Sequence, residues 1–518
     1  MLSTEKTFEA KVKQKKKGSR VEEDPLKKDA KIGIVGGGIG GLSTALALKR
    51  AGFTNIVVYE RDECFNQYRR DGYGLTLTYN PKGPLAKLGI LEQVCLQDTP
   101  SRSHYLFQAP KGNILGYYGR AFSAYNADKN NDGIHNGQRG NLRIPRQKLR
   151  EILLHELLLT KYNATEGTDD NASIEVRWGK RLIHYVHYSN TVSMTSPCHT
   201  DDKKSQAHLK EEQKKTEGST TQDGFVTLFF ADGTIDRVEL LIAADGIYST
   251  VQAKLEDDQH SNVKNHDKIY CSLNAPPPST LQYIGIMLIN GITLGFHHPL
   301  LDERGFYTVD GENRLFTMPF EGSYVDDHLR EFLSTEGEQQ REGLVTQTTT
   351  RRTMWQLSFR LPDVALANQL RQGGPNRLLE EALRRCSSWH PPVCDMLRST
   401  PLDCIWGSGL MDRMPNVRKK AKTKTVSLKT QSRRIVVLGD AMHAMSPFKG
   451  QGANQALSDG PLLVDWLCRK GAILTDALSH FEREMIHRTR NKVIAYLIRS
   501  SRKELQKMVI MTSERNGR

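Results

Sequence analysis

The chain has 518 residues, of which 38% are hydrophobic and 25% are charged, and its formal net charge is +14. This length exceeds what one hydrophobic core normally holds, so we expect at least two domains, or one large domain with an appendage. Its apolar runs are far too short to cross a bilayer, which excludes a transmembrane helix.

The positive charge is concentrated in three segments. Residues 1–30, 416–434 and 482–518 carry net charges of +3, +8 and +6, so the rest of the chain carries −3. We interpret residues 1–30 as a disordered basic tail, and residues 195–223 and 416–432 as a polar and a basic insertion in loops. Because the basicity lies outside the folded body, no nucleic-acid partner is expected, although binding through the charged insertions stays an alternative.

The cysteines and the N-terminus say more about compartment than about chemistry. The eight cysteines contain no CxxC pair and no spacing typical of a zinc site, so no metal site is expected. The first residues lack the apolar stretch of a secretory signal and contain several acidic side chains. We therefore expect reduced thiols and a cytoplasmic location.

The first patterned segment predicts a strand, a helix and a second strand within about thirty residues. Residues 32–35 are apolar, residues 42–50 have helical spacing, and residues 56–59 are again apolar and β-branched. The turn after the first strand contains Gly36, Gly38 and Gly41 in the spacing GxGxxG, and Glu60 follows the second strand.

This glycine turn predicts a dinucleotide site. Glycines at these positions let the backbone turn tightly and approach a pyrophosphate, whose charge faces the N-terminus of the following helix. The carboxylate of Glu60 can accept hydrogen bonds from a ribose, which favours FAD or NAD over NADP. A glycine-rich turn with a purely structural role is the alternative.

A second constellation near the C-terminal end favours FAD. An apolar strand at residues 434–438 runs into Gly439-Asp440, followed by Pro447 and the sequence Gly450-Gln451-Gly452-Ala453-Asn454. An Asp at the carboxyl end of a strand can bind a polyol, and a glycine-flanked turn that opens a helix offers N–H groups to an anionic ring edge. A flavin, with a ribityl chain and an isoalloxazine ring, uses such a second site.

The pattern of predicted secondary structure changes between residues 281 and 320. Several short strands are predicted there, with turns at Asn290-Gly291 and Asp310-Gly311, which indicates a second, mostly antiparallel domain. Large side chains on its strands are candidates for an apolar substrate pocket. They are Tyr283, Phe296, His297, Tyr307, Phe316 and Met318.

Taken in order, these motifs resemble those of the FAD-dependent aromatic hydroxylases. That family includes para-hydroxybenzoate and salicylate hydroxylases, carotenoid epoxidases and tetracycline-inactivating monooxygenases. Residues 439–454 are similar to its GD motif, and Asp245-Gly246 with Ser249 to its DG motif. Residues 144–149 resemble the segment whose arginine reaches the flavin nucleotide, and residues 72–75 resemble the loop beside the isoalloxazine.

The resemblance implies a role for each matching residue. Gly36, Gly38 and Gly41 would line the pyrophosphate, Glu60 the adenosine ribose, and Arg146 the phosphate or ribityl region. Asp440 would bind the ribityl hydroxyls, and Gly74 would lie beside the flavin ring with Pro447, Gly450, Gly452 and Ala453. Asp245 and Gly246 would serve both flavin and nicotinamide. Ala243 and Gln252 stand where the family usually has Gly and Arg, so this chain departs from the family pattern in the segment that handles the reductant.

The implied architecture is a discontinuous Rossmann-like α/β FAD-binding domain with a smaller antiparallel substrate domain and C-terminal helices. We predict residues 31–255 and 433–470 for the first, 256–415 for the second and 471–518 for the helices. The last segment could pack on the body, contact a membrane surface or form an oligomer contact, and the first of these is favoured. Arg69 and Arg70 could reach a nicotinamide phosphate or an anionic substrate.

The implied activity is that of a monooxygenase. NAD(P)H would reduce FAD, O₂ would add to it, and the flavin hydroperoxide would transfer one oxygen atom to an aromatic, polyketide-like or other apolar small molecule by hydroxylation or epoxidation. No catalytic acid or base is assigned, because the cofactor carries the chemistry. His443, three residues after Asp440, is interpreted as a packed residue. A flavoprotein reductase, or a non-catalytic flavin-binding redox sensor, is the alternative.

Overall fold

A computed structural model defines the fold in ten ranges of the chain. They are residues 25–65, 72–99, 103–119, 141–159, 173–188, 224–261, 281–301, 304–320, 352–413 and 434–499. The predicted tail up to residue 24, both charged insertions, Arg69, Arg70 and residues 500–518 lie outside the described residues. The predictions for those segments stay predictions.

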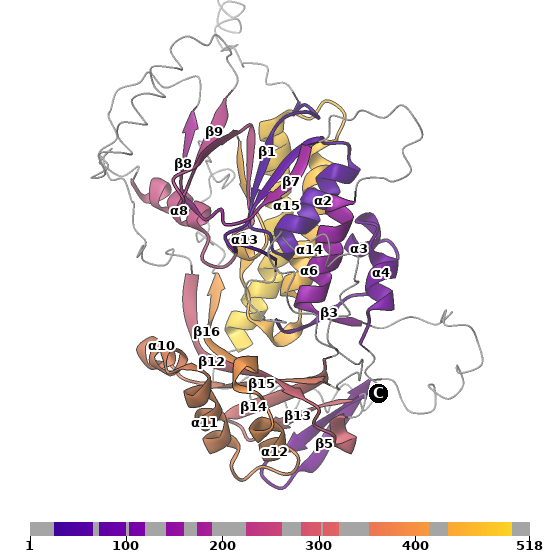
Figure 1. Cartoon of the computed structure of the whole chain (residues 1–518), viewed down its shortest axis with the longest axis vertical. Helices are drawn as coiled ribbons and strands as arrows, with labels where there is room; N and C mark the ends of the chain where they lie inside the picture. Colours follow the sequence, from indigo (N-terminus) through magenta and orange to yellow (C-terminus); the bar gives the residue numbers. More distant parts are fainter. Residues whose placement is uncertain are drawn as a thin grey trace, which may run out of the picture.

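A five-stranded parallel sheet forms the centre of the larger body in Figure 1. Its strand order is β17 (Ile435–Val437), β11 (Leu240–Ala243), β1 (Ile32–Val35), β2 (Asn55–Tyr59) and β7 (Ser173–Arg177). Every neighbouring pair is parallel. β1, β11 and β17 are buried along their whole length, which explains their unbroken apolar sequences.

Helices cover one face of this sheet and a small sheet covers the other. The helices are α2 (Ile39–Arg50), α6 (Arg146–Leu158), α14 (Gly452–Leu467) and α15 (Leu474–Arg499), and their core includes Leu46, Leu153 and Phe481. On the opposite face lies an antiparallel sheet of β10 (Ile235–Val238), β9 (Phe225–Phe230) and β8 (Leu182–Tyr188), with α8 (Thr250–Ser261) beside it. α2 joins the parallel strands β1 and β2, so the predicted βαβ unit is confirmed.

Smaller elements complete this body near the second one. β3 (Gly74–Leu77) pairs antiparallel with β6 (Leu142–Pro145), and α3 (Pro84–Lys87) and α4 (Leu91–Leu96) lie beside α14 and α6. Strands of the parallel sheet come from Ile32 at one end of the sequence and Val437 near the other. The predicted discontinuous Rossmann-like architecture is therefore confirmed.

The second body is a seven-stranded sheet. Its order is β16 (Ile405–Arg413), β12 (Leu281–Leu294), β15 (Arg352–Arg360), β14 (Asn313–Pro319), β13 (Gly305–Val309), β4 (Ser103–Gln108) and β5 (Asn113–Gly119). All pairs are antiparallel except β13 with β4. Figure 1 shows α10 (Val364–Gln372), α11 (Gly374–Cys386) and α12 (Val393–Arg398) on one side of this sheet, over a core that includes Trp355.

Two features of this sheet differ from the sequence expectation. β4 and β5 lie in it, although their residues fall inside the segment predicted for the FAD-binding domain; β4 joins by pairing with β13, far along the chain. Asn290-Gly291 is not a turn but the middle of the continuous strand β12. Gly291 is needed there because the Trp355 ring covers it: a Cβ would lie 2.3 Å from Trp355 Cε2.

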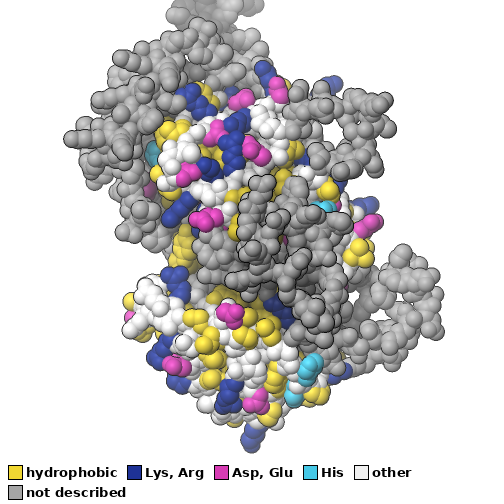
Figure 2. All heavy atoms as spheres, viewed as in Figure 1, with side chains coloured by type: hydrophobic (Ala, Val, Ile, Leu, Met, Phe, Trp, Pro, Cys, Tyr) yellow, Lys and Arg dark blue, Asp and Glu magenta, His cyan; other side chains and the backbone are white. Residues whose placement is uncertain are grey.

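The surface charge and the helices of the described ranges relate to the predictions about nucleic-acid and membrane partners. On the visible face of the larger body, Lys and Arg are interspersed with Asp and Glu rather than gathered in one patch (Figure 2). No helix within the described ranges has the length and apolarity to cross a bilayer. α15 covers the first part of the predicted terminal helix, and its contact with a membrane surface stays a prediction.

Candidate active site

A cavity of about 360 Å³ lies where the two bodies meet. Its walls come from the nucleotide-binding turns on one side and from the seven-stranded sheet on the other. The larger body contributes Gly38, Gly40, Tyr73, Gly74, Thr76, Arg143, Arg146, Gly246, Asp440, Pro447, Phe448, Gly450, Gly452 and Ala453. The sheet contributes His104, Tyr307, Arg314, Phe316, Met318 and Gln356. The motifs that the sequence singled out are thus brought to one place.

The glycine turn opens onto this cavity at the N-terminus of α2. Gly38 and Gly40 border the cavity, and a Cβ on Gly38 would approach only the end of Arg146, at 3.9 Å. Gly36 and Gly41 instead allow the turn to close. A Cβ on Gly36 would lie 2.3 Å from the Ala244 oxygen, and one on Gly41 would lie 1.9 Å from the Gly36 oxygen. The turn therefore presents a bare helix N-terminus, which suits a pyrophosphate.

Glu60 and Arg150 hold this turn from behind. Glu60 Oε2 accepts a 2.7 Å hydrogen bond from the Gly37 N–H, and Arg150 Nε donates to the Gly37 oxygen at 2.6 Å. Arg150 Nη2 lies 3.5 Å from Glu60 Oε2, and its guanidinium packs over the rings of Phe65 and Trp178. Glu60 does not line the cavity itself, so its contact with a ribose stays a prediction.

We expect Arg150→Met to weaken FAD binding about 10- to 100-fold. Methionine keeps most of the packing on Phe65 and Trp178 but removes the positive charge beside the buried Glu60 carboxylate, and charge-assisted pairs of this kind contribute about 1.5–3 kcal/mol. Fluorescence titration of the apoprotein with FAD measures the change. The exposed Arg377 pairs with Glu380 on the same helix and, among the residues that the structure describes, with no other carboxylate, so Arg377→Met is a matched control. Equal FAD affinity in the two variants would contradict this role.

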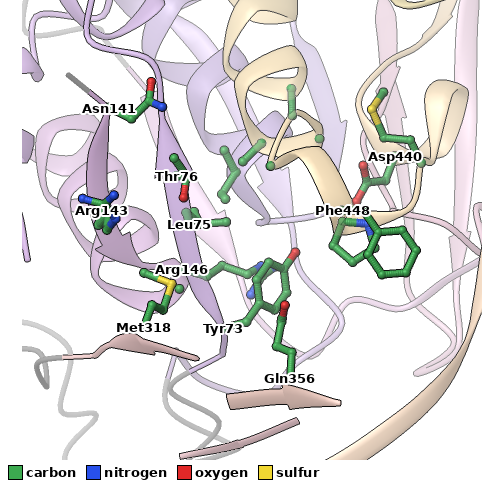
Figure 3. A pocket seen from close by; sticks show the side chains of 18 of the residues that line it. Tyr73, Leu75, Thr76, Asn141, Arg143, Arg146, Met318, Gln356, Asp440 and Phe448 are labelled. Carbon is green, nitrogen blue, oxygen red and sulfur yellow. The ribbon is translucent and has the colours of Figure 1, made fainter. Parts of the chain in front are cut away.

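The GD segment forms the opposite wall. Gly439, with φ +61°, turns β17 into α13 (Asp440–His443), so that Asp440 borders the cavity at the end of the strand. The 3₁₀ turn Pro447–Lys449 ends at Gly450, with φ +60°, and α14 follows. Figure 3 shows Asp440 and Phe448 on this side of the cavity, across from Tyr73 and Arg146.

Asn454 fastens this wall to the strand β3. Its Nδ2 donates to the oxygens of Thr76 at 2.9 Å and Gly450 at 2.8 Å, and its Oδ1 accepts from the Thr78 N–H at 2.9 Å. The amide side chain therefore satisfies backbone groups of both segments at once. It fixes the width of the cavity between Thr76 and the Gly450 turn.

A buried polar cluster supports the GD turn from below. Asp459 of α14 is 0% exposed; its Oδ2 accepts from the Gly439 N–H and lies 2.8 Å from His443 Nε2, and Oδ1 pairs with Arg488 of α15. His443 is buried in this cluster and is not part of the cavity wall. Its placement agrees with the interpretation as a packed residue.

The DG motif meets the cavity through one of its two residues. Gly246 lines it, whereas Asp245 Oδ2 accepts a 2.9 Å hydrogen bond from the Thr250 N–H at the start of α8. Asp245 Oδ1 is buried without a hydrogen-bond partner among the described residues, and burial raises the pKa of this carboxyl. Its part in nicotinamide binding stays a prediction.

The seven-stranded sheet places three of the six predicted substrate residues at the cavity. Tyr307, Phe316 and Met318 line it, and the rings of Tyr307 and Phe316 stack at 4.6 Å between centroids. These two rings give the sheet side of the cavity an aromatic wall.

The other three predicted substrate residues, Tyr283, Phe296 and His297, do not line the cavity. The Tyr283 hydroxyl donates to the Leu361 oxygen at 2.6 Å in the packing against α10. Phe296 packs against the core of the second sheet, and His297 is exposed after the end of β12. Their large side chains therefore pack in the second body or face solvent, and their contact with a substrate stays a prediction.

Several lining residues were not singled out from the sequence. Arg314 precedes Phe316 by two residues on β14, so the alternation that marked Phe316 and Met318 also placed Arg314 on the same face. Gln356 lies opposite Phe316 on β15. His104 had no local signal, because its strand reaches the sheet only through the long-range pairing with β13.

His104 gives the fold a pH dependence. It is 3% exposed beside Phe316, and burial, together with the charge of Arg143, lowers its pKa to about 3. The unfolded chain protonates His104 below its ordinary pKa of 6.5, whereas the folded chain does not, so this residue destabilises the fold progressively as the pH falls from about 6.5 toward 3.

We therefore expect His104→Gln to make the free energy of unfolding depend less steeply on pH at acidic pH. Between about pH 6 and 4 the wild type should lose up to about 1.4 kcal/mol per pH unit relative to the variant. Urea unfolding of both proteins at a series of pH values measures this difference. Parallel profiles would contradict it.

The cavity walls are suited to FAD. The positions where a pyrophosphate would approach the α2 N-terminus are glycines, which have no side chain to block it. Arg146 supplies a positive charge, and Asp440 supplies a carboxylate at the end of a strand. The Gly450 turn leaves the backbone at the start of α14 open to a planar ring.

Comparisons with known proteins point to the same cofactor. A sequence profile described as an FAD binding domain matches residues 409–470, and one described as an NAD(P)-binding Rossmann-like domain matches residues 34–81. A monooxygenase, cfoF of Aspergillus candidus, is 26% identical over 479 residues, covering 88% of this chain and 87% of the relative. The 6-hydroxynicotinate 3-monooxygenase of Bordetella bronchiseptica is 23% identical over 435 residues, covering 84% and 82%.

A solved structure shares the fold. The crystal structure of HpxO from Klebsiella pneumoniae, complexed with FAD and uric acid, superimposes with a TM-score of 0.57 at 19% identity, covering 92% of this chain and 91% of that one. The class defined by motifs, fold and relatives is that of the FAD-dependent monooxygenases. FAD is the cofactor of this chain, and the relatives agree with the resemblance to the aromatic hydroxylases that the motif order indicated.

Proposed function

We propose that the chain uses NAD(P)H and O₂ to insert one oxygen atom into an aromatic, polyketide-like or other apolar small molecule, by hydroxylation or epoxidation. The observation that carries this proposal is the shared cavity, in which Arg146, Asp440 and Gly450 face Tyr307 and Phe316 of the second sheet. A substrate seated against those rings would lie directly beside the flavin-binding turn.

We also propose the binding roles implied by the motifs. Gly36, Gly38 and Gly41 shape the pyrophosphate turn, Glu60 faces the adenosine ribose, Arg146 the phosphate or ribityl region and Asp440 the ribityl hydroxyls. Gly74, Pro447, Gly450, Gly452 and Ala453 enclose the ring, and Asp245 and Gly246 complete the site. Support comes from the cavity, which all of these border except Gly36, Gly41, Glu60 and Asp245.

When bound, FAD supplies the redox chemistry that takes electrons from NAD(P)H and activates O₂. The chain's own contribution is to orient and to exclude water. Tyr307 and Phe316 present aromatic faces to a substrate ring, and Met318 fills the space beside Gly74, where a Cβ would meet its sulfur at 2.8 Å. The wall from Gly74 to Met318 is therefore closed by side-chain packing.

Gln252 lies in a buried hydrogen-bonded cluster beside the DG segment. Gln252, at the position where the family usually has Arg, donates from Nε2 to Glu256 Oε1 at 2.8 Å, and the same oxygen lies 3.1 Å from Arg413 Nη1. The amide is thus used in a buried pair beside the DG segment.

Oxygen consumption and flavin reduction separate this function from its alternatives. Stopped-flow reduction of the holoenzyme by NADH and by NADPH is measured across a panel of aromatic and polyketide compounds, with O₂ uptake followed in parallel. The proposal expects one or more compounds to accelerate reduction and to gain one oxygen atom from labelled O₂. NAD(P)H oxidation without transfer of oxygen to any compound would indicate a reductase, and slow reduction that no compound accelerates would indicate a redox sensor.

A further inference from the structure

A row of five side chains crosses the seven-stranded sheet on the face that borders the cavity. The strand register places Trp406, Asn290, Gln356, Phe316 and Tyr307 side by side on β16, β12, β15, β14 and β13. Residues paired in this way point to the same face of a sheet, and Gln356, Phe316 and Tyr307 line the cavity. The row therefore contains two neighbouring amides with aromatic rings on both sides.

The two amides are not used by the fold. Asn290 is 4% exposed, and its Oδ1 is buried with no hydrogen-bond partner among the residues that the structure describes. The Gln356 amide likewise forms no hydrogen bond with a described residue, and in Figure 3 it points from β15 into the cavity. A buried polar group without a partner is destabilising, so a ligand that satisfies this pair is favoured over one that does not.

The chemistry of an amide edge defines what this ligand presents. The pair carries no charge, so it recognises donors and acceptors rather than an ion. The edge of the Gln356 amide offers one N–H and one carbonyl oxygen, and its complement is a group with the same two features on one edge. Open-chain secondary amides are trans and direct N–H and C=O to opposite sides, whereas a small ring holds them cis. A flat ring also suits the neighbouring faces of Phe316 and Tyr307.

We infer that the substrate contains a planar lactam whose N–H and C=O hydrogen-bond the Gln356 amide while its ring packs against Phe316 and Tyr307. This inference rests on the proposed function and names the substrate class for the same cavity. Gln356 Oε1 accepts the lactam N–H, and one Nε2 hydrogen is donated to the lactam carbonyl. The other Nε2 hydrogen is then free for Asn290 Oδ1, which makes Asn290 a positioning residue for the Gln356 amide.

Lactams and their lactones test this assignment in the holoenzyme, because a lactone keeps the ring and the carbonyl but replaces the N–H by an oxygen atom. The absorbance of bound FAD is titrated with 2-pyridone and 2-pyrone, 2-quinolone and coumarin, and 1-isoquinolone and isocoumarin. We expect at least one lactam to bind about 10- to 100-fold more tightly than its lactone, since the lactone leaves a buried acceptor unpaired.

Variants of the two amides identify the residues that recognise the lactam. Gln356→Leu should remove the preference. Asn290→Leu should weaken lactam binding and leave lactone binding unchanged, whereas a purely structural role would weaken both equally and would overturn its positioning role. Asn368→Leu and Gln369→Leu, at exposed positions of α10, are the matched controls and should leave the preference as it is in the wild type.

The outcomes separate this inference from the proposed function. If no lactam binds more tightly than its lactone, or if Gln356→Leu keeps the preference, the inference is overturned even when FAD binding and oxygen transfer are intact. Retention of FAD by each variant reports that it is folded, and the lactam and lactone comparison in the wild type stands without any variant. Wild-type protein that transfers no oxygen to any compound contradicts the proposed function instead.

Discussion

Gly41→Ala is expected to abolish FAD binding. The added Cβ would lie 1.9 Å from the Gly36 oxygen and 3.4 Å from Ile34 Cγ2, so the turn and the start of α2 must move apart. No side-chain rotation relieves a clash with backbone, and overpacking in a dense core costs about 1–3 kcal/mol, occasionally more. The displaced turn can no longer present its N–H groups to a pyrophosphate. Flavin content of the purified protein and FAD titration of the apoprotein measure the loss.

Gly116→Ala is the control for Gly41→Ala. A Cβ on Gly116, in the edge strand β5, would meet nothing within 4 Å. This variant should keep wild-type flavin content. A yellow Gly41→Ala protein with unchanged FAD affinity would show that the turn does not carry the pyrophosphate.

Asp459→Ala is expected to have the second largest effect. Its carboxylate joins the Gly439 N–H, His443 and Arg488. Removal takes this acceptor from the Gly439 N–H and the buried His443 ring, and it breaks the ion pair with Arg488. Breaking a buried pair in this way typically costs about 3–5 kcal/mol. The Gly439 turn that presents Asp440 to the cavity would loosen as well, so both unfolding free energy and FAD affinity should fall.

A neighbouring Asp on the same helix gives a matched comparison. Asp465 pairs with Lys87 at 2.8 Å, but both side chains are about half exposed. Asp465→Ala should therefore cost no more than about 1 kcal/mol. Urea unfolding of the two holoproteins measures both changes. Equal losses would mean that the Asp459 cluster adds nothing beyond a surface ion pair.

Local sequence signals predicted the fold well where each element carries its own pattern. The glycine turn, the buried strands β1 and β11 and the Asp310-Gly311 hairpin all rest on short-range chemistry. The prediction of a turn at Asn290-Gly291 failed for a physical reason. A glycine within a strand can accommodate a neighbouring ring, here Trp355, and the pair of residues alone does not distinguish this from a turn.

The site was harder to predict because the second sheet assembles from distant segments. His104 enters through a pairing between β4 and β13, which no short-range pattern announces. Tyr283 and His297 have the residue types of a substrate pocket. The register of the long strand β12 places Tyr283 elsewhere, and His297 is exposed after the end of that strand. Arg314 could have been predicted, because alternation along β14 places it on the same face as Phe316 and Met318.

A crystal structure of the chain with FAD tests the central claim most directly, namely that one cavity holds the flavin against the substrate wall. We expect the pyrophosphate at the N-terminus of α2, the ribityl chain at Asp440, and the ring between the Gly450 turn and the face of β14 that carries Phe316 and Arg314. Density for the ring outside this cavity, or separated from β14 by other side chains, would contradict it.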